Sequence, residues 1–154
     1  MQGEHWTVCS EPTLKAFIAH VKKVFDEHKY ATWGAPRIGP DRSIDQNSLF
    51  HLWLTEYAAH LLRKDKRDVT KGECEGMKRT VKREYWKLYH FPFMIHDVIC
   101  PKTGATKKDF TSSASWKQGE MFHVLNYMQD VAATDGLILE SKGEHAKLKR
   151  QQVA

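Results

Sequence analysis

The segment that most restricts the fold begins at Ser43 and extends to about Arg63. Its apolar residues recur at helical spacing and cover more than half of a helix circumference: Leu49, Phe50, Leu52, Trp53, Leu54, Tyr57, Ala58, Leu61 and Leu62. Ser43 and Gln46 stand three residues apart, which is the spacing of a capping box. A helix with such a wide apolar surface is expected to be buried on most sides, centrally in a domain or in an oligomer.

Three further segments have the periodicity of helices. Residues 11–29 follow Ser10 as a cap and carry Pro12 in the first turn, where a missing N–H is harmless. The second of these segments opens with the capping-box pair Thr70 and Glu73 and extends to about Leu88. A third covers about residues 117–134, and Gly136 follows its end.

The remaining segments predict little regular structure beyond one hairpin. Residues 30–38 contain Gly34 and Pro36 and predict an irregular segment or an edge strand. The β-branched run at 95–99 and residues 107–113 predict two strands around a turn. We therefore expect an α+β fold, mostly helical, with one domain over 1–140 and a basic, flexible tail over 141–154.

Length and composition place the chain among globular proteins. Its 154 residues suffice for one domain, and 41% are hydrophobic and 28% charged. No apolar run approaches the roughly 20 residues that cross a bilayer. Three cysteines far apart (Cys9, Cys74 and Cys100) and a start without a signal-peptide pattern favour a reducing compartment. We expect a soluble protein of the cytoplasm.

Positive charge is concentrated between Arg63 and Lys87. This stretch holds ten basic and five acidic residues, an excess equal to the formal net charge of +5 of the whole chain. Such a field attracts polyanions and raises their encounter rate. The alternative is a solvated helix surface on which cations and carboxylates pair.

A helical projection of residues 70–88 separates an apolar side from a basic side. The apolar side, expected to face the core, holds Cys74, Met77, Val81, Tyr85 and Leu88. The opposite side holds Lys71, Lys78, Arg79, Lys82 and Arg83, with Trp86 among them. An outward indole among cations suits unpaired nucleic acid, because bases stack on it while cations contact phosphates. Alternatively, Trp86 packs against another element or a second subunit.

Catalytic patterns are absent from the sequence. It contains no GxSxG, GxxxxGK[ST] or GxGxxG motif, and its nine histidines form no HExxH pair. We therefore expect no catalytic residue, no cofactor and no metal site. The enzyme alternative is a metal-dependent nuclease that uses His90, His96 and Asp97, with Asp109 as a further ligand.

The run Asp41-Arg42-Ser43-Ile44-Asp45-Gln46-Asn47 before a long apolar helix resembles the signature of the NinB (Orf) family of phage recombination proteins. In that family an extended strand is followed by Arg-Ser-x-x-Gln-Asn, which opens a helix. Residues 70–81 resemble the family's next helix, 95–115 its hairpin, and 117–136 its final block. In order, these segments cover roughly residues 11–140.

The resemblance implies a NinB-like fold and a non-enzymatic recombination mediator. It implies a homodimer that binds single-stranded DNA in the bacterial host cytoplasm. It further implies help in loading a strand-annealing or strand-exchange protein onto DNA coated by single-strand-binding protein. An adaptor that binds only proteins stays open as a third possibility.

Charge and resemblance together predict the residues that contact DNA. They are Arg37, Arg42, Arg63, Lys64, Lys66, Arg67, Lys78, Arg79, Lys82, Arg83, Trp86, Lys107 and Lys108. Ser43, Gln46 and Asn47 are expected to cap the helix and lock the adjoining turn. Arg42 lies just outside this helix start, where a phosphate would also be accepted.

Overall fold

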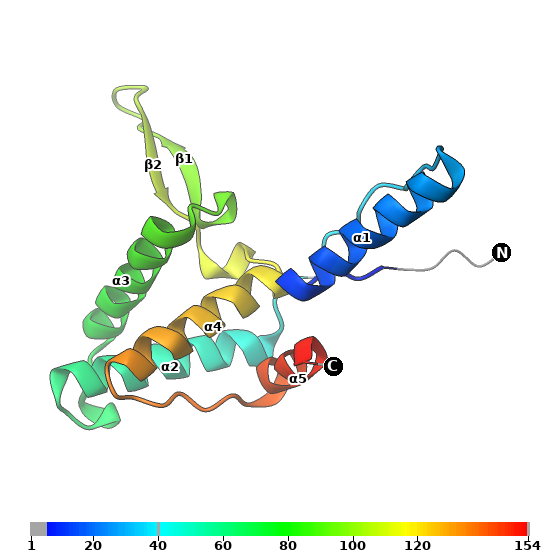
Figure 1. Ribbon diagram of the computed structural model, residues 1–154. Helices are drawn as coiled ribbons and strands as arrows, with labels where there is room; N and C mark the ends of the chain where they lie inside the picture. Colours follow the sequence, from blue (N-terminus) through cyan, green and yellow to red (C-terminus); the bar gives the residue numbers. More distant parts are fainter. Residues whose placement is uncertain (1–5, 40, 154) are drawn as a thin grey trace. The chain divides into compact units, whose positions relative to one another are not determined.

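The computed structural model describes residues 6–39 and 41–153 (Figure 1). The chain divides into two compact units. One contains the residues up to Ile38 together with those from Lys149 onward, and the other contains Gly39–Leu148.

The first unit is built on α1 (Glu11–His28). Ser10 caps this helix, and its hydroxyl and Thr13 form the reciprocal contacts of a capping box. Lys29 adopts a left-handed conformation, and its N–H donates to the Phe25 carbonyl, which ends the helix. The segment 30–39 contains no strand, so of the two alternatives for this region the irregular one is observed.

Three helices form the core of the second unit: α2 (Ile44–Leu62), α3 (Lys71–Tyr89) and α4 (Gln118–Thr134). Each pair of these helices is in contact, and α2 packs against both of the others. Trp53 of α2, Tyr85 of α3 and Leu125 of α4 are fully buried between them. The central position expected for α2 is therefore observed, although Leu61 and Leu62 near its end are half exposed.

A hairpin follows α3 and extends away from the helices (Figure 1). Strand β1 (Ile95–Ile99) pairs antiparallel with β2 (Thr106–Phe110), with Ile95 opposite Phe110. Gly104 takes a φ of 66° in the turn between them, a conformation that glycine adopts without steric cost. Short 3-10 turns connect the elements: η1 (Lys66–Asp68), η2 (Pro92–Met94) and η3 (Ser113–Ser115). The predicted fold class, mostly helical with a small antiparallel hairpin, is confirmed.

Helix α5 (Gly143–Val153) lies in the segment expected to be a flexible tail. The sequence predicts no helix here because the segment is polar and has few apolar anchors. In the structure His145 is the anchor: it is buried, with its ring 5.4 Å from Trp53 and 5.1 Å from Phe122. The flexibility of this segment stays a prediction.

Within the described parts of the chain, no helix is both long and apolar enough to cross a membrane.

Candidate nucleic-acid interface

The motif at the start of α2 forms a closed set of internal hydrogen bonds. The Gln46 N–H donates to Ser43 Oγ at 3.0 Å, and the Ser43 N–H donates to Gln46 Oε1 at 3.1 Å. Gln46 Nε2 donates to the carbonyl of Gln118 at 3.1 Å, and the whole side chain is buried. Ser43 and Gln46 therefore cap α2, and Gln46 also joins it to the start of α4.

Arg42 and Asp41 extend this junction. Arg42 Nε donates to the Ser113 carbonyl at 2.6 Å, and its backbone N–H donates to the Trp116 carbonyl. Lys117 Nζ lies 2.6 Å from Asp41 Oδ1, and this ion pair lowers the pKa of Asp41 and raises that of Lys117. The half-buried Arg42 thus has a structural contact in addition to its predicted DNA contact.

Lys82 does not lie on an outward face, and this expectation was wrong. Its side chain is buried, with 7% exposed, and Nζ donates to the Thr111 carbonyl at 2.7 Å. Nζ also lies 5.4 Å from the centroid of the Trp116 ring. Burial lowers the pKa of Lys82 to about 8. The chain following β2 covers this side of α3, which a projection of an isolated helix cannot show.

Trp86 is half-buried and packs against the hydrophobic core. Its ring also meets that of His90 edge-on at 5.1 Å. The packing alternative for this indole is therefore the observed arrangement. Trp86 is not the bare stacking surface that its place among cations predicted.

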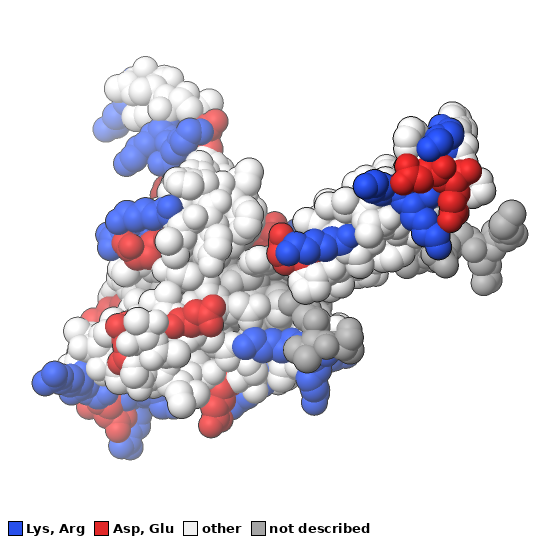
Figure 2. All heavy atoms as spheres, viewed as in Figure 1, with Lys and Arg blue, Asp and Glu red and all other residues white. Residues whose placement is uncertain are grey.

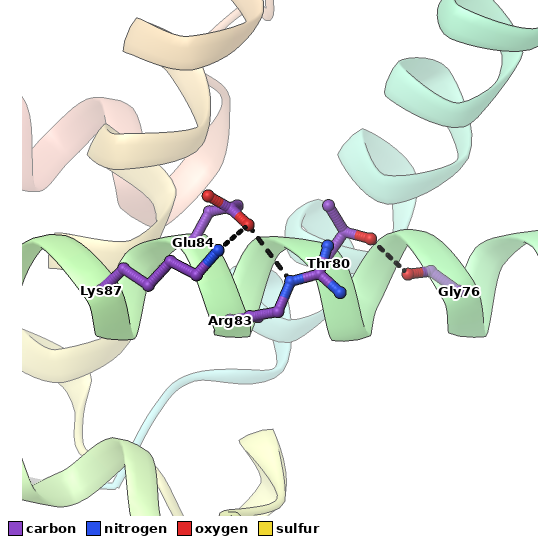
Figure 3. A network of polar contacts seen from close by, with 5 residues as sticks. All are labelled: Gly76, Thr80, Arg83, Glu84 and Lys87. Atoms are coloured by element: carbon purple, nitrogen blue, oxygen red, sulfur yellow. Dashed lines mark hydrogen bonds and ion pairs between the residues drawn. The ribbon is translucent and has the colours of Figure 1, made fainter.

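The exposed side of α3 carries Arg79, Arg83 and Lys87. Glu84 Oε1 accepts from Arg83 Nε and from Lys87 Nζ, both at 3.1 Å (Figure 3). These two contacts hold the pKa of Glu84 below its usual value. One carboxylate thus offsets part of the charge of two cations. Arg79 forms no ion pair with the described residues.

An open groove of about 750 Å³ lies beside the loop that connects α2 and α3. Arg63, Lys64 and Lys66 line it from the loop, and Lys142 lines it from the segment before α5. Leu137 and Ile138 contribute apolar surface. Three of the predicted DNA-contacting residues are thereby brought together, and lysine and arginine also gather over this loop in Figure 2.

Some of the cations beside the groove form ion pairs. Lys64 Nζ lies 2.5 Å from Glu73 Oε1, and Lys66 Nζ lies 3.3 Å from Glu56 Oε1. Arg67, whose Nε is 3.2 Å from Asp65 Oδ1, is largely exposed. Arg63 and Lys142 are exposed and form no ion pair within the described part of the chain. The groove also contains the carboxylates of Glu56, Asp65 and Glu140.

The other predicted contacts lie away from the groove lining. Lys107 and Lys108 are exposed on β2, and Lys108 Nζ is 2.9 Å from Asp97 Oδ1 across the hairpin. Lys78 is half-buried on α3. Arg37 is exposed in the other compact unit, so its place relative to the groove is not described.

The residues of the nuclease alternative do not converge on a site. His96 lies opposite Asp109 in the strand register, whereas Asp97 lies opposite Lys108 on the other face of the hairpin. His90 caps the end of α3. Among the described residues, no three side chains of His, Cys, Asp or Glu are placed to hold a metal ion.

A row of aromatic rings that begins at the end of α3 was not predicted from the sequence. The Tyr89 and Phe91 rings are nearly parallel, at 5°, with centroids 5.6 Å apart. Phe91 and Phe93 follow at 22° and 6.1 Å. The alternation of aromatic residues in Tyr89-His90-Phe91-Pro92-Phe93 is the signal that would have indicated it.

Comparisons with known proteins gave one structural match. A solved structure described as "Structural Genomics, NinB" is similar with a TM-score of 0.41 and 15% sequence identity, over 99% of this chain and 97% of that chain. No protein-family model matches the sequence. No curated protein matches it either. The resemblance of the motif around Arg42 to the NinB family stays a prediction from the sequence.

Proposed function

We propose that this protein binds single-stranded DNA and that the groove beside the α2–α3 loop holds part of the strand. The observation that carries the proposal is the open groove of about 750 Å³, whose lining includes the exposed cations Arg63 and Lys142, which form no ion pair with the residues that the structure describes. Cations in a groove contact successive phosphates, and a flexible single strand can follow a curved surface that a duplex cannot. Arg67 and Arg79 are exposed and lie outside the groove lining.

The role we propose for this binding is that of a recombination mediator. It rests on the likeness of residues 41–47 to the NinB motif, and the exposed cations of the groove support its DNA-binding part. In this role the protein acts as a homodimer and assists a strand-annealing or strand-exchange protein. Single-strand-binding protein and a phage or host recombinase are the partners that this role requires.

A titration of a labelled oligothymidine by fluorescence polarisation at several salt concentrations tests the DNA binding. The double variant Arg63→Gln, Lys142→Gln should bind about tenfold more weakly at low salt. Each phosphate contact contributes roughly 0.7 to the slope of log affinity against log salt, so the slope should decrease by about 1.4.

The matched control is Lys102→Gln, which removes an exposed cation of the hairpin turn outside the groove lining. It should change affinity by less than about twofold, and circular dichroism should show all variants folded. Unchanged affinity and slope in the folded double variant would exclude the groove. A wild-type protein that binds no oligonucleotide at low salt would exclude the function and favour the adaptor alternative.

A further inference from the structure

The aromatic row after α3 remains partly open to solvent. The side chain of Tyr89 is 44% exposed and that of Phe91 is 36% exposed, although their rings contact buried neighbours. Tyr89 lies 4.8 Å from the buried Tyr85, and Phe93 lies 5.9 Å from the buried Trp116, between ring centroids. The inner side of the row is therefore anchored in the core while Tyr89 and Phe91 remain accessible.

Such an arrangement is unusual for residues that serve only the core. Exposed aromatic surface that is contiguous and held rigid marks a contact site more often than isolated exposed residues do. The Tyr89 and Phe91 rings stack on each other nearly in parallel, so a base that stacks on the outer side of this pair would continue the row. A flat π-face held in place by buried neighbours is the surface on which another planar ring stacks at little entropic cost.

The charges around the row decide which planar ligand it suits. Burial and then the Glu84 carboxylate raise the pKa of Tyr127. Glu84 also accepts hydrogen bonds from Arg83 and Lys87. Together these three groups carry a net positive charge. Burial, Tyr89 and the Glu120 carboxylate raise the pKa of Tyr85. Glu120 also accepts a hydrogen bond from the backbone N–H of Lys117 at the start of α4. The Glu84 carboxylate is thus outweighed by two cations, which favours a ligand with negative charge.

We propose that Tyr89 and Phe91 form a stacking platform for unpaired bases, with Phe93 supporting it from the core side. This inference rests on the proposed DNA binding and adds a second contact site of a different kind. The groove contacts phosphates, whereas the platform contacts bases. The groove lies beside the start of α3 and the platform lies at its end. These ends are roughly 27 Å apart, because a helix rises about 1.5 Å per residue. The platform and the groove would therefore contact different nucleotides of one strand.

The difference between the two contacts supplies the test. The variants Tyr89→Leu and Phe91→Leu retain an apolar side chain but lose the aromatic face. The double variant should bind an oligothymidine of about 16 nucleotides roughly 10-fold more weakly. Its affinity for an abasic oligonucleotide of equal length should remain unchanged, because that strand has phosphates but no bases.

The salt dependence separates this platform from the groove. The platform variants should leave the slope of log affinity against log salt as it is in the wild type, since no phosphate contact is removed. The groove variants should lower the slope on both oligonucleotides. Leu88→Ala is the matched control, because Leu88 is 66% exposed beside the row and has no ring. It should bind like the wild type.

Conservative variants distinguish the loss of the aromatic face from a disturbance of the fold. Tyr89→Phe and Phe91→Tyr keep the ring and should retain wild-type affinity for the base-containing strand. Equal weakening on the abasic and the normal strand, or wild-type affinity of the folded double leucine variant, would overturn the platform. In the second case an intact groove effect would leave the proposed DNA binding in place.

Discussion

Lys82 Nζ donates a 2.7 Å hydrogen bond to the carbonyl oxygen of Thr111 and thereby joins helix α3 to the chain that leaves the hairpin. The ammonium group also lies over the ring of Trp116. The ammonium group thus links elements that lie far apart in the sequence. It is therefore not available to a phosphate, although it belongs to the most basic segment of the chain.

The burial of Lys82 predicts a pH-dependent stability. Its pKa is lowered from 10.5 to about 8 in the folded protein, so the unfolded state binds more protons between these two values. The free energy of unfolding should therefore rise from pH 8 to pH 10.5, by about 3 kcal/mol from this residue. Below pH 8 its contribution is constant.

Urea unfolding of the wild type and Lys82→Met across this pH range measures the effect. The unfolding free energy of the wild type should rise with pH relative to that of Lys82→Met, since only the wild type carries the titrating group. Lys87→Met, at an exposed lysine of the same helix, is the control. A constant difference from pH 8 to pH 10.5 would show that Lys82 is solvated.

Replacing the buried Gln46 should lower the free energy of unfolding more than replacing an exposed polar residue of α2. Replacement by alanine leaves the Ser43 N–H and the Gln118 carbonyl without their present partners in a buried site. The expected loss is about 1–3 kcal/mol. Urea unfolding should show it, whereas Ser48→Ala at an exposed position of α2 should change stability little. Equal stability of both variants would argue against the observed cap.

Glu84→Gln should strengthen the binding of single-stranded DNA. The substitution removes the carboxylate that Arg83 and Lys87 share and leaves both cations available to phosphates (Figure 3). Affinity at low salt should rise about threefold to tenfold, with a slope steeper by roughly 0.7 for each added phosphate contact. Polarisation titrations measure both quantities. Weaker binding would place the strand away from this side of α3.

Two glycines should respond to alanine with opposite signs. Gly143 has a φ of 54°, a left-handed conformation that is strained for alanine, so Gly143→Ala should lower stability by about 1–2 kcal/mol. Gly76 lies inside α3 with open space around it, and Gly76→Ala should raise stability by about 1 kcal/mol. Thermal unfolding compares the two. Stabilisation by Gly143→Ala would contradict the left-handed start of α5.

Local sequence signals predicted most of the secondary structure. Ser43 with Gln46, and Thr70 with Glu73, placed the starts of α2 and α3 because a capping box depends on residues only three apart. The strand over 95–99 was predicted at its observed bounds, while the returning strand begins and ends earlier than expected. The helix α5 was not predicted, because its anchor His145 packs against Trp53 and Phe122, which are distant in sequence.

What the sequence alone determined is helices α1 to α4, the hairpin and the location of excess positive charge, because these follow from spacing and composition. Only the tertiary structure decided which cations remain accessible. Lys82 is buried under the chain after β2, whereas Arg63 lines an open groove. The reason is physical: accessibility depends on which distant segment packs over a side chain, and helical periodicity describes only one segment at a time.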